Sequence, residues 1–392
     1  MKLDIFMIPY IISTPRFSPE AAVDRYLLQI SIAFLLFLGT CWGGPLPSVA
    51  VGTCKPNLQS YPTIQDAVSN VAAGGTVLVC PGVYPEQVLI TKPVTMKGVL
   101  SGNAATSIIT SPKGGLKQST VDHLGNMWAA QVLVQSTAGP VDISDLSVDA
   151  ANNKVSGSCP GLNVVGIYYQ EASGVIDRAA TRNQTTPCFH DAGIFLESFG
   201  SPNQTVTVEN SSVRGFDGSG IYADTDFTTP TLTLTIASNL VTGEVGTATG
   251  MALGNIKGTV KSNIVERMFY GIEVFHATMT VTSNTIAGDG GSGGAPIIID
   301  RDGSTLMGNK IDAAGATGAI FGDAGSSIFK SNTVFNFSLA VSGCSGSFPP
   351  PSGYTVSGNT MIDGTNGVRM TNSNTTAPNT YSSVTTPVSS CT

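Results

Sequence analysis

One short pattern recurs through the second half of this 392-residue chain. In each copy an Asn is followed two positions later by an apolar residue, and then by a segment in which Gly precedes an apolar residue. The Asn positions are Asn239, Asn263, Asn284, Asn309, Asn332 and Asn359, with Ser211 at the equivalent place before them. Successive copies lie 21 to 28 residues apart, which is the period of a solenoid. The repeat therefore predicts a stack of short-stranded coils and not one globular core.

The composition agrees with many short strands joined by tight turns. Only 11% of the residues are charged, and 45 are Gly. The net charge of −7 comes without the basic stripe that neutralises phosphates, so we expect no nucleic-acid partner. An acidic surface is also a poor match for acidic polymers unless calcium bridges the two.

The N-terminal region has the pattern of an export signal. The apolar run Leu27–Leu38 is 12 residues long, which is short for a membrane span and typical of a signal-peptide core. Small residues at 48–50 then offer a cleavage site after Ala50. A lipoprotein signal at Cys41 is the alternative, but residues 38–40 match it poorly. We therefore expect a secreted, periplasmic or cell-surface protein without a membrane span in the mature chain.

Cleavage after Ala50 would leave an even number of cysteines. The six that remain are Cys54, Cys80, Cys159, Cys188, Cys344 and Cys391. An even count in an exported chain favours disulfides, and pairing neighbours gives 54–80, 159–188 and 344–391. Six cysteines allow 15 pairings, and partly buried free thiols are the alternative.

A short helix is predicted ahead of the repeats, over residues 63–72. Its apolar residues have helical spacing, and Thr63 with Asp66 resembles a capping box. Strands are expected at 76–79, 88–90 and 94–96. Such a helix would close the open end of the first coil.

This entry segment carries a family resemblance. The sequence of residues 63–99 is TIQDAVSNVAAGGTVLVCPGVYPEQVLITKPVTMKGV, and it resembles the entry of right-handed parallel β-helix proteins of the pectin-lyase-like superfamily. The later repeats resemble the coils of that superfamily, so the resemblance covers roughly residues 60–370. It implies an all-β chain in one right-handed parallel β-helix. We expect an export segment at 1–50, a cap at 51–75, the β-helix at 76–371 and a Thr/Ser/Asn-rich tail at 372–392.

Three segments interrupt the repeat, at 100–128, 149–163 and 179–190. Inserted loops on a solenoid commonly gather on one face and border a binding cleft. The last of them ends at His190, and Asp191 follows it. These two residues could border the same cleft, but a structural role in the loop is the favoured interpretation.

The Gly-Ile segments align as strands, in which the first and third residues after Gly face inward and the second and fourth face outward. The second column reads Tyr168, Phe195, Tyr222, Ala252, Glu273, Ile298, Ile320 and Arg369. Its three consecutive aromatic residues predict a platform on which sugar rings stack. The alternative is that an inserted loop covers them and that they are ordinary packing.

The fourth column brings two carboxylates together. Glu197 and Asp224 lie on adjacent coils, so their backbones should be roughly 4.8 Å apart. Such a pair raises one pKa or binds a cation, which suggests an acid–base pair or a calcium site completed by Asp226. Asp217, in the turn before that strand, is a weaker candidate.

Further candidates continue along the same face. His276 at a strand end could act as a base, or be a solvated turn residue. Asp300 and Arg301 could contact substrate together with Glu273, or form a local ion-paired turn.

The resemblance implies that this face carries the site in polysaccharide lyases and hydrolases. The signature motifs of polygalacturonases, pectate lyases and pectin methylesterases are missing, and Glu86 is left without a role. The leading hypothesis is an exported protein that binds polysaccharide through Tyr168, Phe195 and Tyr222. As a lyase or hydrolase it would cleave the chain with Glu197, Asp224, Asp300 and His276. The alternative is a non-catalytic, adhesin-like surface solenoid.

Overall fold

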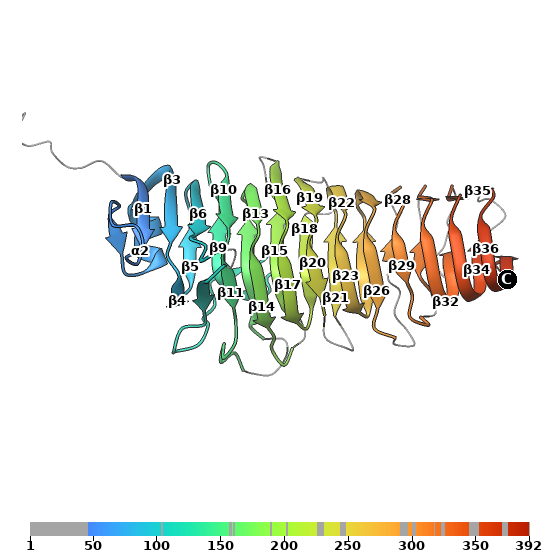
Figure 1. Cartoon of the computed structure of the whole chain (residues 1–392), viewed down its shortest axis with the longest axis horizontal. Coiled ribbons are helices and arrows are strands. Elements are labelled where there is room, and N and C mark those ends of the chain that lie inside the picture. The colour runs from blue at the N-terminus through green and yellow to red at the C-terminus, as the bar shows by residue number, and fades with distance from the viewer. Residues whose placement is uncertain are drawn as a thin grey trace, which may run out of the picture. The chain divides into compact units, whose positions relative to one another are not determined.

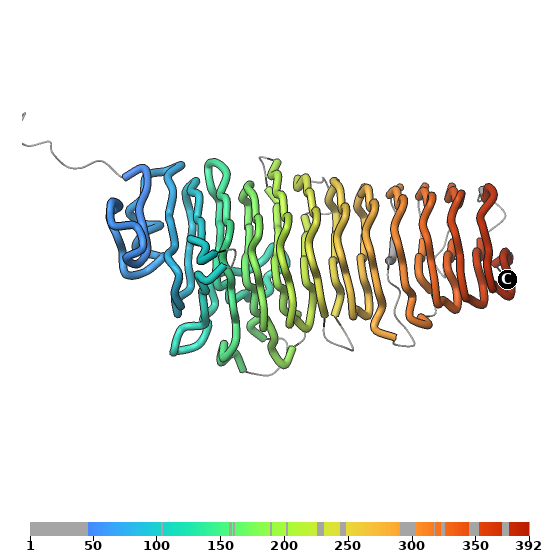
Figure 2. The backbone as a smooth tube through the Cα atoms, in the orientation of Figure 1, coloured from blue at the N-terminus to red at the C-terminus, as the bar shows by residue number. Residues whose placement is uncertain are grey.

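The structure is a computed structural model, and the chain from Leu46 onward forms one compact unit. It describes residues 46–102, 105–156, 159, 161–188, 190–200, 203–225, 231–243, 248–290, 297–299, 303–316, 318–322, 326–344, 353–370 and 375–391. The fold is a right-handed parallel β-helix, as predicted, with coils stacked along its length (Figure 1 and Figure 2).

One side of the coils is a 14-stranded parallel sheet. Its strands in chain order are β1 (Leu46–Val51), β2 (Ser60–Tyr61), β3 (Val71–Val79), β6 (Val94–Gly98), β10 (Val141–Ser144), β13 (Gly174–Asp177), β16 (Gln204–Glu209), β19 (Leu232–Ala237), β22 (Lys257–Lys261), β25 (Thr278–Thr282), β28 (Thr305–Met307), β31 (Ile328–Lys330), β33 (Thr355–Ser357) and β35 (Thr375–Thr376).

The other sides belong to a 22-stranded sheet. The strands that follow the Asn turns, or stand in the same row, are β4 (Gly82–Pro85), β7 (Ser107–Thr110), β11 (Ser147–Asp149), β14 (Ala180–Gln184), β17 (Ser212–Phe216), β20 (Leu240–Thr242), β23 (Ile264–Met268), β26 (Thr285–Gly288) and β29 (Lys310–Asp312). The Gly-Ile strands and those in register with them are β5 (Val88–Ile90), β9 (Met127–Gln135), β12 (Asn163–Gln170), β15 (Ala192–Ser198), β18 (Ser219–Thr225), β21 (Thr249–Gly254), β24 (Tyr270–Phe275), β27 (Ile297–Ile299) and β30 (Ile320–Gly322); we call their outer side the Gly-Ile face. Both rows merge in β32 (Thr333–Gly343), β34 (Thr360–Met370) and β36 (Thr380–Ser390), and β8 (Thr120–Val121) pairs antiparallel with β9.

The inward columns form the core. Ile167, Ile194, Ile221 and Met251 follow one another in register and are fully buried. The alignment fails by one residue in β30, where Ile320 and not Ala319 pairs with Ile297. Ile320 therefore faces the core, and its predicted outward position is wrong.

A ladder of Asn side chains runs along the turns, as the repeat predicted. The Oδ1 atom of Asn284 accepts bonds from the backbone N–H and the amide of Asn263, both at 2.9 Å. Its own amide donates to Asn309 Oδ1 and to the Val260 carbonyl, both at 3.0 Å. The same pattern links Asn239 through Asn359 and extends to Asn379. These bonds satisfy amides that are buried inside the turn.

The helix at the N-terminal end is α2 (Ile64–Asn70), shorter than predicted. Thr63 caps it by accepting the Asp66 N–H at 3.0 Å. Glu86 completes the cap, because its carboxylate accepts the N–H groups of Ile64 and Gln65, each at 2.9 Å. The buried side of α2 then closes the first coil.

Three disulfides join Cys54–Cys80, Cys159–Cys188 and Cys344–Cys391, which is the predicted pairing. Two expected boundaries differ from the structure. Ala50 is buried in β1, so cleavage after it would remove most of a strand that pairs with β3. Residues 380–390 of the expected Thr/Ser/Asn-rich tail form a further strand of the β-helix, because β36 pairs with β34 over its whole length. The predicted signal core at 27–38 lies outside the described residues.

No helix among the described residues is long and apolar enough to span a membrane.

Candidate functional site

The predicted aromatic column exists, but most of it is covered. Tyr168, Phe195 and Tyr222 are in register on β12, β15 and β18. Their rings stack with centroid distances of 4.4 and 4.6 Å. Tyr168 and Phe195 are only 0% and 1% exposed, because Trp128 lies against them, 4.9 Å from the Phe195 ring. Neither can stack on a sugar in this structure, so the covering-loop alternative is the correct one for them. Tyr222 is partly exposed.

The cover is a hairpin of residues 119–128, formed by β8 and the start of β9. Asp122 organises its turn: one carboxylate oxygen accepts the N–H groups of Leu124 (3.0 Å) and Asn126 (2.8 Å). The other accepts the Asn126 amide at 2.8 Å and the Trp128 indole N–H at 3.0 Å. The hairpin therefore delivers an indole ring, already hydrogen-bonded, onto the aromatic column.

Glu197 anchors this hairpin. Its Oε1 atom accepts the His123 N–H at 2.7 Å and lies 2.7 Å from His123 Nδ1. Its Oε2 atom accepts the hydroxyl of Tyr168 and, at 3.0 Å, the amide of Gln170. Burial raises the pKa of Glu197, and these donors oppose the increase. The carboxylate therefore faces protein groups and not an open cleft.

Asp224 is the register partner of Glu197, as predicted, and is also buried. It accepts bonds from the Tyr222 hydroxyl (3.1 Å), the Thr225 N–H (2.8 Å) and the Asn255 amide (3.0 Å). Within the described parts of the chain, no group of three or more His, Cys, Asp or Glu residues is arranged to hold a metal ion. Asp226, the third proposed calcium ligand, lies outside them.

The structure does not bring the remaining predicted site residues to the region around Glu197 and Asp224. Glu273 is on β24, two strands beyond Tyr222 in the same column, and His276 follows that strand with a left-handed backbone (φ 51°). Both interact with other groups. Asp300 and Arg301 lie outside the described residues.

A cavity of about 440 Å³ opens beside the hairpin, where the Gly-Ile strands begin. Its wall combines aromatic rings, carboxamides, hydroxyls and carboxyl groups: Asp122, Asn126, Trp128, Gly161, Asn163, His190, Asp191, Ala192, Gly218, Ser219, Tyr222 and Thr249. The exposed edge of the aromatic column, Tyr222, therefore forms part of the cavity.

Two carboxyl groups meet at one side of this cavity. Asp191 is fully buried, and its Oδ1 atom accepts the Val164 N–H at 2.5 Å. Asp217 accepts the Thr186 N–H at 3.0 Å. The Oδ2 atom of Asp191 and the Oδ1 atom of Asp217 are both buried and accept no bond from any other described residue. The negative charge of Asp191 raises the pKa of Asp217, so the two carboxyl groups lie near one another, and a proton shared between them would give both of these oxygens a partner.

This arrangement favours a retained proton. Burial raises the pKa of Asp217 to about 8, and the hydrogen bond and negative charge of Asp191 act in the same direction. Burial also raises the pKa of Asp191, while its bonds to Asp217, Val164 and Thr186 oppose the increase. The pair can therefore hold a proton at neutral pH, as a general acid requires.

Close backbone packing fixes the pair. Gly218 lies against the backbone of residues 190–191, where an added Cβ would come within 2.4 Å of the Asp191 carbonyl oxygen. The Ser219 N–H donates to that same oxygen at 2.9 Å. The Cys159–Cys188 disulfide ties together the two loops that precede β12 and β15. The sequence pattern singled out Asp191 and Asp217 as separate residues, but nothing in their spacing predicted that the two side chains lie close together.

The fold is shared with enzymes that modify polysaccharides. The model of the right-handed β-helix region matches residues 249–386. The A-module of the mannuronan C-5 epimerase AlgE4 from Azotobacter vinelandii superposes with a TM-score of 0.56 at 15% identity, over 83% of this chain and 92% of the module. A PL6 alginate lyase solved with a trisaccharide gives 0.51 at 13% identity, over 87% and 85% of the two chains. A GH87 α-1,3-glucanase from Streptomyces thermodiastaticus gives 0.50 at 18%, over 89% and 70%.

A comparison with curated proteins gives no match. With sequence identities of 13–18%, the structural likeness establishes the fold only. For the fold, it confirms the expected resemblance to pectin-lyase-like β-helix proteins.

Proposed function

We propose that this chain binds and processes a polysaccharide in the cavity at the start of β12, β15 and β18. The observation that carries the proposal is the pair of buried carboxyl groups of Asp191 and Asp217, whose environment favours retention of a proton, beside a cavity walled by Trp128 and Tyr222. Concave sites with aromatic walls and a few convergent polar groups are typical of ligand pockets, and strongly shifted carboxyl groups concentrate at active sites.

In this proposal Asp191 is the catalytic acid, because it lines the cavity. Its carboxyl group is buried, so transfer of the proton to a bound sugar would require the cavity wall to open locally around it. Asp217 lies behind it and is a positioning residue, which holds the shared proton and returns it to Asp191. Trp128 and Tyr222 offer ring surfaces to the apolar side of a sugar. The similar solved structures support the substrate class, since they include an epimerase, a lyase and a glucanase that act on polysaccharides.

The location follows from the disulfides. Three disulfides favour an oxidising compartment, so we infer that the protein works outside the cell or in a periplasm.

A turnover screen on plant and microbial polysaccharides tests the proposal. Asp191→Asn should lower turnover of any accepted substrate by roughly 10²- to 10⁴-fold, the usual contribution of a general acid. Asp217→Asn should shift the alkaline limb of the pH–rate profile, because it removes the group that shares the proton of Asp191.

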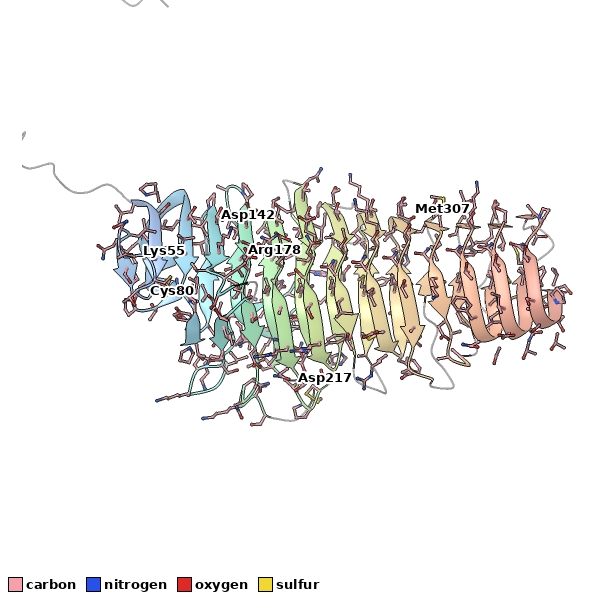
Figure 3. The ribbon with its side chains drawn as sticks, viewed as in Figure 1. Lys55, Cys80, Asp142, Arg178, Asp217 and Met307 are labelled. Atoms are coloured by element: carbon pink, nitrogen blue, oxygen red, sulfur yellow. A yellow bond between two sulfur atoms is a disulfide. The ribbon has the colours of Figure 1, made fainter. Side chains whose placement is uncertain are left out.

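Asp142→Asn is the matched control. Asp142 lies on β10 in the opposite sheet, and Figure 3 shows it near the other edge of the coils from Asp217. Its only described bond, from the Val175 N–H, would be kept by an Asn. Unchanged turnover in Asp191→Asn would refute the assignment of the acid. Binding without turnover in the wild type would favour the adhesin-like alternative.

A further inference from the structure

We propose that the cavity receives an uncharged sugar unit, so that the reaction is hydrolysis of a neutral glycan. This inference rests on the proposed function and specifies its substrate class. It separates the chain from the uronate-modifying enzymes that share its fold.

The charged groups of the cavity wall limit which ligands can bind. Asp122 and Asp191 bring two carboxyl groups to the wall, and among its described residues none is Lys or Arg. The stretches 157–160, 226–230 and 244–247, which flank the same strands, also contain neither residue in their sequence. On these coils Arg182, which is bound to Asp149 at 2.8 Å, and its register partner Arg214 are not among the residues of the wall.

This charge pattern disfavours a uronate. A carboxylate ligand is normally held by Arg or Lys or by a bound cation, and Arg does so through paired hydrogen bonds. Here a uronate carboxylate would instead lie beside Asp122 and the Asp191–Asp217 pair, and the described wall offers no cation to offset the like-charge repulsion. The chain's net charge of −7 adds to the repulsion.

The uncharged part of the wall suits a neutral sugar. Asn126 and Asn163 offer carboxamide donors and acceptors, and Ser219 and Thr249 offer hydroxyls. Groups of this kind exchange hydrogen bonds with sugar hydroxyls without requiring a charge on the ligand. Tyr222 supplies the aromatic surface.

The ligand class also limits the chemistry. β-Elimination and C5 epimerisation both remove the C5 proton, which is acidified by the carboxyl group of a uronate. A neutral hexose lacks that activation, so cleavage of its glycosidic bond requires water. The bond from C1 to the leaving oxygen breaks as Asp191 gives that oxygen a proton. The oxygen of water forms the new bond to C1, and His190, which also lines the cavity, takes the proton that water loses.

Binding and product analysis of matched ligands test the inference. The probes are neutral hexose oligosaccharides and oligouronates of equal length with non-cleavable thioglycosidic links, titrated by calorimetry into the wild-type protein. We expect roughly tenfold or tighter binding of a neutral ligand, given the like-charge cost of the uronate. Wild-type products should carry new reducing ends and no ultraviolet-absorbing unsaturated ends.

An added charge gives a sharper test. Asn126→Lys places a cation at the cavity wall on an exposed hairpin position, and it should reduce the preference for neutral ligands. Leu124→Lys adds the same charge on the same hairpin, at a position that does not line the cavity, and should leave the preference unchanged.

The outcomes separate the two proposals. Preference of the unsubstituted cavity for uronates would overturn this inference and leave the proposed function standing if Asp191→Asn still abolishes turnover. Binding of a neutral ligand with no turnover of any polymer would overturn the proposed function, while the assignment of an uncharged ligand would stand. Binding of neither ligand class would overturn both.

Discussion

Asp217 keeps its proton into mildly alkaline solution because burial and the adjacent Asp191 both disfavour its ionised form. A carboxyl group with a raised pKa stabilises the folded state most at pH values below its unfolded pKa, near 4. That contribution is lost as the pH rises toward the folded pKa of about 8. The same feature that makes the pair a proton donor therefore makes the fold less stable at alkaline pH.

The Asp217→Asn variant should remove much of this pH dependence. An Asn can accept the Thr186 N–H and donate to Asp191, so it imitates the protonated acid at every pH. The melting temperature of the wild type should fall between pH 5 and pH 9, and that of Asp217→Asn should fall clearly less. Asp142→Asn should follow the wild type. Parallel melting curves for all three proteins would show that the pair does not retain a proton.

For single residues, the sequence predicted better on which side of a strand a side chain lies than whether that side chain is buried. The alternation of strand residues placed Glu197 beside Asp224 correctly, because register depends only on local spacing. Burial could not be predicted, since one of the residues that bind the Glu197 carboxylate is His123, 74 positions away in the hairpin. The Asp191–Asp217 contact depends on backbone packing at Gly218, for which single-sequence patterns give no signal.

Among the structural elements, the hairpin of residues 119–128 has the largest effect on the site. It covers the aromatic column and contributes Asp122, Asn126 and Trp128 to the cavity wall. Its turn relies strongly on one side chain, because the Asp122 carboxylate accepts four bonds within it, beside two backbone bonds. The region was recognised as a break in the repeat, but its antiparallel pairing was not predicted.

Asp122→Ala should release the hairpin. Four bonds to a carboxylate are lost and the buried Trp128 N–H is left unpaired, which should cost roughly 3 kcal/mol. Limited chymotrypsin digestion should then cut near the exposed Leu124 much faster, and the fluorescence of Trp128 should shift toward that of a solvated indole.

Asp312→Ala is the control for that experiment. Asp312 accepts the Ala314 N–H in a distant turn at 3.0 Å, so its loss should not affect the hairpin. Equal cleavage in both variants would contradict the role given to Asp122.

Over the whole molecule, the two ends are stabilised differently. The N-terminal end is closed by α2, whose cap includes Glu86. At the C-terminal end β36 is the last strand of the described ladder, and Cys344–Cys391 fastens it to β32. The coil order, the cap and the disulfides could be predicted because each has a local sequence signature. The extent of the last coil could not, since its Thr/Ser-rich strand resembles a loose tail.

Replacing Cys344 and Cys391 by Ser should loosen the C-terminal end selectively. The bridge spans 47 residues, so its loss should cost about 4 kcal/mol in the chain-entropy account. Because each coil contacts mainly its neighbours, hydrogen exchange should speed up first in β36 and β34 and remain slow in β3. A uniform loss of protection along the chain would show that the coils unfold as one unit.

The bonds of the Asn ladder all run in one sense, since each amide donates to the Oδ1 atom of the Asn in the following coil. If a whole coil with its one Asn is gained or lost, the flanking Asn residues can therefore still meet as donor and acceptor. If only part of a coil is gained or lost, they cannot. Descendants of such a gene can change length in steps of one coil. Such changes beyond Asn263 would leave the cavity beside the hairpin unaltered, because all of its described wall precedes β23.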